Sequence, residues 1–171
     1  MNKSIKFIFL MVMLAIPAAI FTFLKFFGDN RFDVEIFYQN GNEGVNDCPM
    51  TSGQYYLADS LISFPNRIHI VLFVEGNDST QVRNIKARLL DTFNDQVSIS
   101  LIGGADFDMA SQVYENIDKI ITCGFLSKDK DDLILVDSQR RIRGYYKRDL
   151  DEIDRLIVET KIIVENEQRD E

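Results

Sequence analysis

The sequence LILVDSQRRIRGYYKRDLDEIDRLI, residues 133–157, predicts two short strands followed by a helix. Leu133–Val136 and Ile142–Tyr146 are rich in apolar, β-branched and aromatic residues, and the polar residues between them are typical of a hairpin turn. Asp149 is the expected N-cap of the helix, with Glu152 at its third position, and the acidic first turn suits the helix dipole. The helix is expected to bury Ile153, Leu156, Ile157, Ile163 and Val164.

Strands and helices alternate before this hairpin. Ile68–Val74 is a nearly continuous apolar run, typical of a strand buried on both faces, and Val97–Gly103 is a second strand. A helix capped by Asp78 is predicted between them, with an apolar stripe at helical spacing formed by Val82, Ile85, Leu89 and Phe93. Met109–Ile121 carries a weaker helical pattern. The order β-α-β-α-β-β-α predicts an α/β, thioredoxin-like fold, in which the first two strands are parallel and the hairpin is antiparallel.

The amino-acid sequence of the hairpin indicates a smaller class of proteins than the fold does. ILVDSQRRIRGYY, residues 134–146, resembles the LVD-x-x-G-x-IRGYY segment of the Sco/SenC family, membrane-anchored thioredoxin-fold proteins that deliver copper to cytochrome c oxidase. The resemblance implies a CxxxC motif after the first core strand and a histidine before LVD, which together bind copper. Here 74–80 contains no cysteine and 127–132 contains no histidine. The chain is therefore identified as a divergent member that lacks the copper ligands.

The turn of the hairpin also departs from the family wording. Arg140 stands where the family has glycine. A two-residue hairpin loop would favour glycine there, so the turn is expected to be longer or of type I.

Cys48 and Cys123 are the only cysteines of the chain. A disulfide between them, two separate thiols, and a metal or redox role are all compatible with the sequence. Cys48-Pro49-Met50-Thr51 also resembles the CPxMT that begins at the second family cysteine, and in that register the first cysteine falls at Gly44. The ligand set for copper is incomplete in either register. No cofactor is expected, and copper held by Cys48 and Cys123 is the alternative.

Three other groups of residues could carry chemistry. The single histidine, His69, lies in a buried strand and is interpreted as a core side chain. Asp129, Asp131 and Asp132 alternate with lysines and lack the glycine and terminal glutamate of a calcium loop, so they are interpreted as solvated. A basic group near the hairpin could bind an anionic partner surface or simply balance an acidic chain, and its members are Arg140, Arg141, Arg143, Lys147 and Arg148.

The N-terminus contains an apolar run that is long enough to cross a membrane. Phe7–Leu24 is uncharged and is bracketed by Lys6 and Lys25. We interpret it as a retained anchor over residues 7–27; a cleaved signal peptide is the alternative, with only a weak cleavage site at 17–19. The balance of lysines predicts a cytoplasmic N-terminus, residues 1–6, and an exported, periplasmic C-terminal part.

Composition and layout limit the possible functions. The net charge of −8 argues against nucleic acid as a partner, because nothing neutralises a row of phosphates. Residues 28–65 are rich in glycine, asparagine and serine and predict an irregular stalk that wraps the domain, with one short strand at Phe32–Tyr38. Residues 66–171 form the predicted thioredoxin-like domain.

These observations lead to two hypotheses. The first is a non-catalytic, membrane-anchored interaction or assembly factor with an unidentified protein partner, linked to respiratory oxidase biogenesis. The second is a copper-handling or thiol-redox protein that uses Cys48 and Cys123.

Overall fold

The computed structural model describes residues 3–27, 32–42, 48–61, 67–74, 79–103, 112–113, 116–129 and 133–170. The chain divides into two units, Met1–Phe32 and Asp33–Glu171. The first unit contains the helix α1, Lys3–Phe27, whose side chains from Ser4 to Phe26 are exposed. Residues Ser4–Phe26 of this helix are long and apolar enough to span a membrane.

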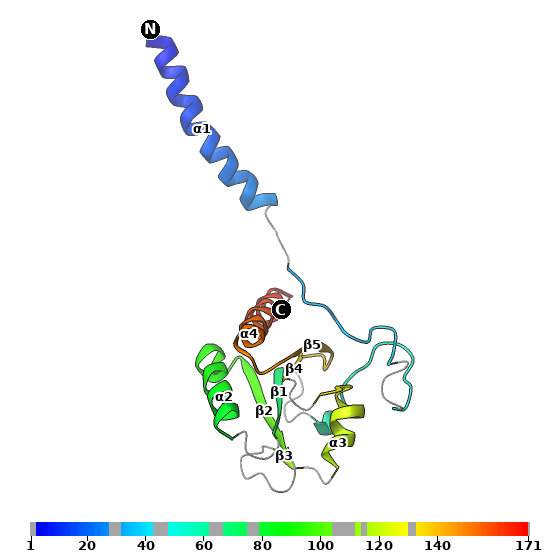
Figure 1. Cartoon of the computed structure of the whole chain (residues 1–171). Helices are drawn as coiled ribbons and strands as arrows, with labels where there is room; N and C mark the ends of the chain where they lie inside the picture. Colours follow the sequence, from blue (N-terminus) through cyan, green and yellow to red (C-terminus); the bar gives the residue numbers. More distant parts are fainter. Residues whose placement is uncertain are drawn as a thin grey trace. The chain divides into compact units, whose positions relative to one another are not determined.

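The second unit is built on a mixed β-sheet (Figure 1). The strand order is β3-β2-β1-β4-β5, with the strands at Ile68–Val74 (β1), Val97–Gly103 (β2), Gln112–Val113 (β3), Leu133–Val136 (β4) and Ile142–Tyr146 (β5). β1 and β2 are parallel, whereas β1 with β4 and β4 with β5 are antiparallel. Leaving aside the two-residue β3, this is the arrangement that defines a thioredoxin-like fold, and it confirms the predicted fold class.

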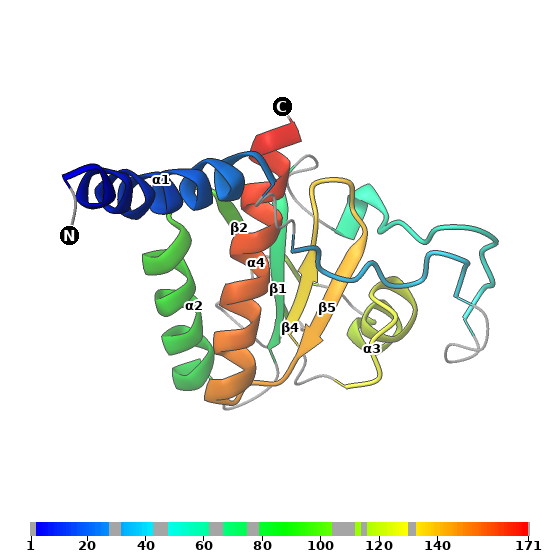
Figure 2. The same ribbon diagram turned by 90° about the horizontal axis from the view of Figure 1, so that it is seen from above.

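Two helices cover one face of the sheet. α2, Ser79–Phe93, and α4, Leu150–Asp170, lie side by side on it (Figures 1 and 2). The core on this face contains the apolar stripes predicted for both helices, from Val82 to Phe93 and from Ile153 to Val164. The Asp149 side chain accepts a hydrogen bond from the backbone N–H of Glu152, so the predicted N-cap is confirmed. Asp78, the predicted cap of α2, lies outside the described residues.

The opposite face is covered by less regular structure. α3, Ile117–Lys119, continues directly into a π-helical turn, η2, Ile120–Gly124, and both lie across the sheet from α2 and α4 (Figure 2). A short 3₁₀ helix, η1, Asp59–Leu61, ends the described part of the stalk. Leu57 and Leu61 of the stalk pack with Phe125 in a second core. Because this face is closed by the stalk rather than by a long helix, the site described below forms here.

Two predicted elements differ from the structure. Phe32–Tyr38 is not a strand: Phe37 donates one backbone hydrogen bond to the Ile142 carbonyl, and Tyr38, with φ 54°, then turns the chain away. The predicted helix at Met109–Ile121 is wrong at Gln112 and Val113, which pair with β2. It is confirmed only at its end, because the helix begins after its cap, Asn116, and continues through Ile121. The described stalk residues from Asp33 onward belong to the second unit.

Tyr146 joins the hairpin to α4. Its ring folds back over Gly144, where a Cβ atom would lie 2.3 Å from the Tyr146 hydroxyl, so only glycine fits beneath it. The hydroxyl donates a hydrogen bond to Glu159, and the guanidinium of Arg155 stacks 4.7 Å from the ring centroid. Burial, followed by the hydrogen bond to the Glu159 carboxylate, raises the pKa of Tyr146 well above its ordinary value.

Candidate functional site: a cavity beside a disulfide

Cys48 and Cys123 form a disulfide, which is one of the alternatives that the sequence left open. Their Cα atoms are 5.4 Å apart, and 75 residues of sequence separate them. Cys48 belongs to the stalk and Cys123 to η2, so the bond ties the stalk to the helical wall of the second core. Both residues are half-buried.

The stalk wall is rigidified by one buried asparagine. Asn42 is 2% exposed, and its amide donates to the Pro49 carbonyl at 3.1 Å. Its Oδ1 accepts from the Thr51 backbone N–H at 2.7 Å and from the Thr51 hydroxyl at 3.0 Å. Gly41, with φ 109°, precedes it, and a Cβ there would lie 2.3 Å from the Thr51 carbonyl oxygen. Only glycine allows this close approach, which positions Pro49 and Cys48 beside η2.

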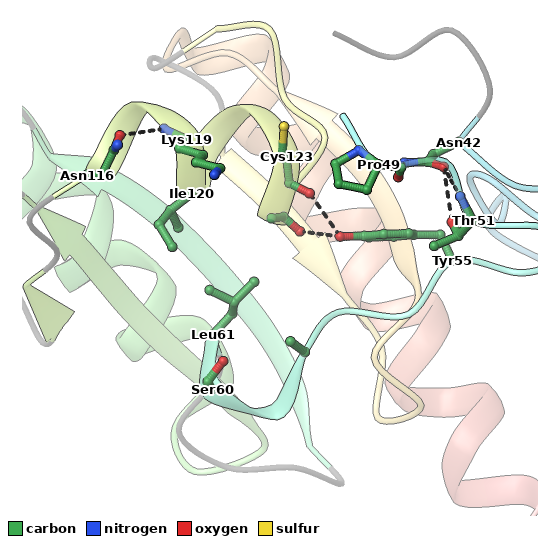
Figure 3. Close-up of a pocket in the computed structure, with 12 residues that line it drawn as sticks. Asn42, Pro49, Thr51, Tyr55, Ser60, Leu61, Asn116, Lys119, Ile120 and Cys123 are labelled. Carbon is green, nitrogen blue, oxygen red and sulfur yellow. Dashed lines mark hydrogen bonds between the residues drawn. The ribbon is translucent and has the colours of Figure 1, made fainter. Parts of the chain in front are cut away.

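Three tyrosine hydroxyls satisfy the carbonyl groups at the end of η2. Tyr55 donates to the Cys123 and Gly124 carbonyls at 3.1 and 2.9 Å (Figure 3). Tyr145 donates to the Phe125 carbonyl at 2.8 Å, and Tyr38 to that of Leu126 at 3.3 Å. The last carbonyls of a helix have no partner within the helix, so these contacts replace an ordinary C-cap. Burial raises the pKa of Tyr55, which keeps its hydroxyl a donor.

A cavity of about 480 Å³ lies between the stalk and the α3–η2 turn. Leu61 and Ile120 approach from opposite sides, and the Tyr55 ring, Cys123 and Pro49 lie farther along it (Figure 3). The volume is within the range of small-ligand pockets, and the lining is mainly apolar with a few polar groups. The other lining residues are Asn42, Thr51, Ala58, Ser60, Asn116, Lys119 and Gly124.

Most of these residues were not predicted from the sequence as a site. The single signal in the sequence was the pair of cysteines. Asn42, Tyr55 and Lys119 carry no motif, because each acts through contacts that the fold alone creates, such as the bonds of Tyr55 to carbonyls 68 and 69 residues away.

The disulfide does not occupy the position of the reactive cysteines in thioredoxin-like enzymes. Those cysteines lie where the first core strand meets the next helix, because the helix N-terminus lowers the thiol pKa. In this chain that position is the end of β1 and the start of α2, residues 74–80, where the sequence has no cysteine. Residues 75–78 lie outside the described part of the structure.

The residues considered from the sequence as metal ligands are bonded, buried or paired where the structure describes them. Cys48 and Cys123 bond to each other, and His69 is fully buried in β1. Within the ranges that the structure describes, no three His, Cys, Asp or Glu residues come together as a metal site. Asp129 pairs with Lys147, and Asp131 and Asp132 lie outside those ranges. In this disulfide-bonded form the two cysteines are not available as the thiolate ligands that the family resemblance implies for copper.

The basic residues near the hairpin do not form one exposed patch. Arg143 is 6% exposed and binds Asp137 and Asp33. It is buried because a β-bulge at its position turns its side chain inward beneath the stalk. Each of the others also has a partner in the fold: Arg140 pairs with Asp59, Arg141 with Asp137, Lys147 with Asp129, and Arg148 donates to the Phe73 carbonyl.

Comparison with known proteins gives similarity in structure only. No family model matches the chain, and no curated protein sequence matches it. The thioredoxin domain of a thiol-disulfide oxidoreductase from Bacteroides vulgatus is 12% identical with a TM-score of 0.45, over 78% of this chain and 96% of that chain. A member of the Sco family of cytochrome c oxidase assembly proteins is 14% identical with a TM-score of 0.43, over 79% of this chain and 95% of that chain.

A Sco/SenC family lipoprotein from Bacillus anthracis is 11% identical with a TM-score of 0.43, over 78% of this chain and 96% of that chain. These three solved structures are thus one thioredoxin-domain protein and two Sco proteins. At these identities the likeness concerns the fold alone. The topology of the second unit defines a thioredoxin-like domain.

Proposed function

We propose that this protein is a membrane-anchored binding module, a thioredoxin-like domain that acts as an assembly factor through contacts with a partner protein. The observation that carries the proposal is the Cys48–Cys123 disulfide, which lies away from the catalytic position of the fold and holds the wall of a cavity. The Sco/SenC wording of the hairpin supports a link to respiratory oxidase biogenesis.

A thiol-exchange assay tests the binding-module proposal. The full chain in detergent is added to insulin and dithiothreitol, and precipitation of reduced insulin is followed by turbidity. We expect the same rate with the wild type as with a Cys48→Ser/Cys123→Ser double variant. A faster rate that the double variant loses would contradict the proposal, because it would make the disulfide a redox centre.

That redox activity is the second candidate function. It is favoured by one observation: Cys123 lines the cavity and is only half-buried, so a substrate thiolate could approach its sulfur. A Cu(I) titration of the reduced chain against a chromophoric chelator tests the copper version. Stoichiometric binding that Cys48→Ser abolishes would support copper handling, and binding indistinguishable from the double variant would exclude it.

The link to oxidase assembly requires its own experiment. The tagged full chain and a bait consisting of residues 1–32 alone are captured from membranes, and cytochrome c oxidase subunits are quantified in both. We expect enrichment that depends on residues 33–171. Equal amounts of oxidase subunits with both baits would contradict a role in oxidase assembly.

A further inference from the structure

The cavity beside the disulfide is lined mainly by apolar groups and by one cationic side chain, Lys119. Leu61 and Ile120 face each other across it (Figure 3), and Ala58 and the Tyr55 ring also line it. The Tyr55 hydroxyl is already bonded to two carbonyls, so this residue offers a ring surface rather than a polar group. Asn42 and Thr51 are likewise bonded to each other. The space between Leu61 and Ile120 therefore suits an apolar body.

The polar groups still available lie on the α3 turn. The Asn116 Oδ1 accepts the Lys119 backbone N–H at 3.2 Å, which leaves the Asn116 amide group as a donor. The ammonium group of Lys119 forms no ion pair with any described residue, although most of the basic residues around the hairpin do. One ammonium and one amide match a singly charged carboxylate, since phosphate groups are usually held by several donors or by arginine.

We propose that this cavity binds a small apolar carboxylic acid, with its hydrocarbon body between Leu61 and Ile120 and its carboxylate at Lys119. The chain as a whole is acidic, with a net charge of −8, so long-range attraction does not gather anions here. Recognition depends instead on the short contact with Lys119. This inference goes beyond the proposed function and does not require a partner protein.

The disulfide controls the shape of this site. Cys123 lines one wall, and Cys48 is next to Pro49, which lines the other. The bond therefore fixes the distance between the two walls. Without it the stalk is still held by the Tyr55 hydrogen bonds to η2 and by the packing of Leu57 and Leu61, but Pro49 is no longer tied to the wall that contains Cys123. The apolar body of a ligand then loses part of its enclosure.

A tryptophan reporter makes binding measurable. The chain has no tryptophan, and Met50, which is 74% exposed, lies between the lining residues Pro49 and Thr51. Met50→Trp in the full chain, in nanodiscs of neutral phospholipid, is titrated with 4-phenylbutyrate and with its neutral isostere, 4-phenylbutyramide. Leu90→Trp on α2 is the matched control for effects of the ligand on the lipid. We expect saturation only for Met50→Trp, with a Kd for the acid on the order of 1 mM or below.

Two variants in the Met50→Trp background separate the carboxylate contact from the apolar contact. Lys119→Gln should raise the Kd of the acid by about two- to fivefold, as for loss of an exposed ion pair. The Kd of the amide should not change. Lys161→Gln, an exposed lysine of α4, should change neither. Cys48→Ser/Cys123→Ser should raise the Kd of the acid and the Kd of the amide by the same factor.

Three results would overturn the proposal. The first is no saturable change with the acid at about tenfold above the expected Kd. The second is equal binding of acid and amide to the Met50→Trp chain with Lys119 intact, and the third is unchanged binding of the acid after Lys119→Gln in the same background. Because Lys119 is exposed and its ammonium group forms no ion pair with the described residues, its variant does not threaten folding.

Discussion

Asp137 and Arg143, the aspartate of LVD and the arginine of IRGYY, are buried against each other. The Asp137 carboxylate is fully buried and accepts from the backbone N–H groups of Gln139 and Arg141 at 3.0 and 2.9 Å. Arg143 Nη1 donates to it at 3.1 Å, and the rest of the guanidinium donates to the carbonyls of Val34 and Glu35 in the stalk. These two residues of the Sco/SenC-like segment therefore attach the stalk to the hairpin.

Replacing Arg143 should be strongly destabilising. Arg143→Ala leaves Asp137 buried with only Arg141 as its cationic partner, and breaking a buried ion pair typically costs about 3–5 kcal/mol. We expect the lower end, about 3 kcal/mol, in urea unfolding of the full chain in detergent followed by circular dichroism. Arg88→Ala, which removes an exposed ion pair with Asp154, is the control and should cost less than about 1 kcal/mol. Equal losses for the two variants would contradict this role for Arg143.

The geometry of the hairpin loop shows how the chain accommodates Arg140 where the Sco/SenC segment has glycine. The Arg140 N–H donates to the Asp137 carbonyl at 2.9 Å, and the Asp137 N–H to the Arg141 carbonyl at 3.0 Å. Arg140 itself has φ 67°. This is a three-residue loop, in which a type I turn is followed by a left-handed residue, so the prediction of a longer or type I turn is confirmed. Glycine would adopt this φ without strain, and the arginine contacts Asp59 and the Leu57 carbonyl instead.

A pair of variants measures the backbone strain at this position. Arg140→Ala and Arg140→Gly both remove the side-chain contacts, but only glycine relieves the left-handed conformation. We expect Arg140→Gly to be more stable than Arg140→Ala by about 1 kcal/mol, read as the difference in their free energies of unfolding. If the alanine variant were as stable as the glycine variant, the loop would not hold residue 140 at positive φ.

The regular elements were predictable, and the reason is physical. The predicted strands at 68–74, 97–103, 133–136 and 142–146 coincide with the observed strands, because their apolar, β-branched residues fit a sheet buried on both faces. The prediction at 32–38 was wrong because alternation reports a strand only if a neighbour pairs with it along its length. The helical segment formed by α3 and η2 is short and changes from α-helical to π-helical geometry. The spacing of its apolar residues therefore could not show at which residue the helix begins.

At the scale of the whole molecule, the disulfide is the strongest single constraint that the described residues contain. Joining residues 75 apart reduces the entropy of the unfolded chain, and the loop-entropy relation gives about 4 kcal/mol. Cys48→Ser/Cys123→Ser should lower the free energy of unfolding by about that amount, measured by urea unfolding under non-reducing conditions. Wild-type protein with dithiothreitol should match the double variant. A loss below about 1 kcal/mol would show that the unfolded chain is already constrained there.

The candidate site was predictable only in part. The two cysteines marked it, but nothing in the sequence chose between a disulfide, two thiols and a metal site. The cavity exists because the stalk returns to the α3–η2 turn, and side-chain contacts to distant carbonyls leave no periodic pattern. The basic residues, in contrast, looked like a surface patch because a β-bulge that buries Arg143 has no signature in the sequence.

The contact of the stalk with β5 also dictates an order of events. Phe37 bonds to the Ile142 carbonyl, and Arg143 reaches back 110 residues to Asp33. Ribosomes make the stalk long before β5, so these contacts must wait until nearly the whole chain has been synthesised. Closing such long loops is slow and entropically costly. The outer edge of the hairpin therefore remains open to other strands until the stalk, which is made first, reaches β5, which is made more than 100 residues later.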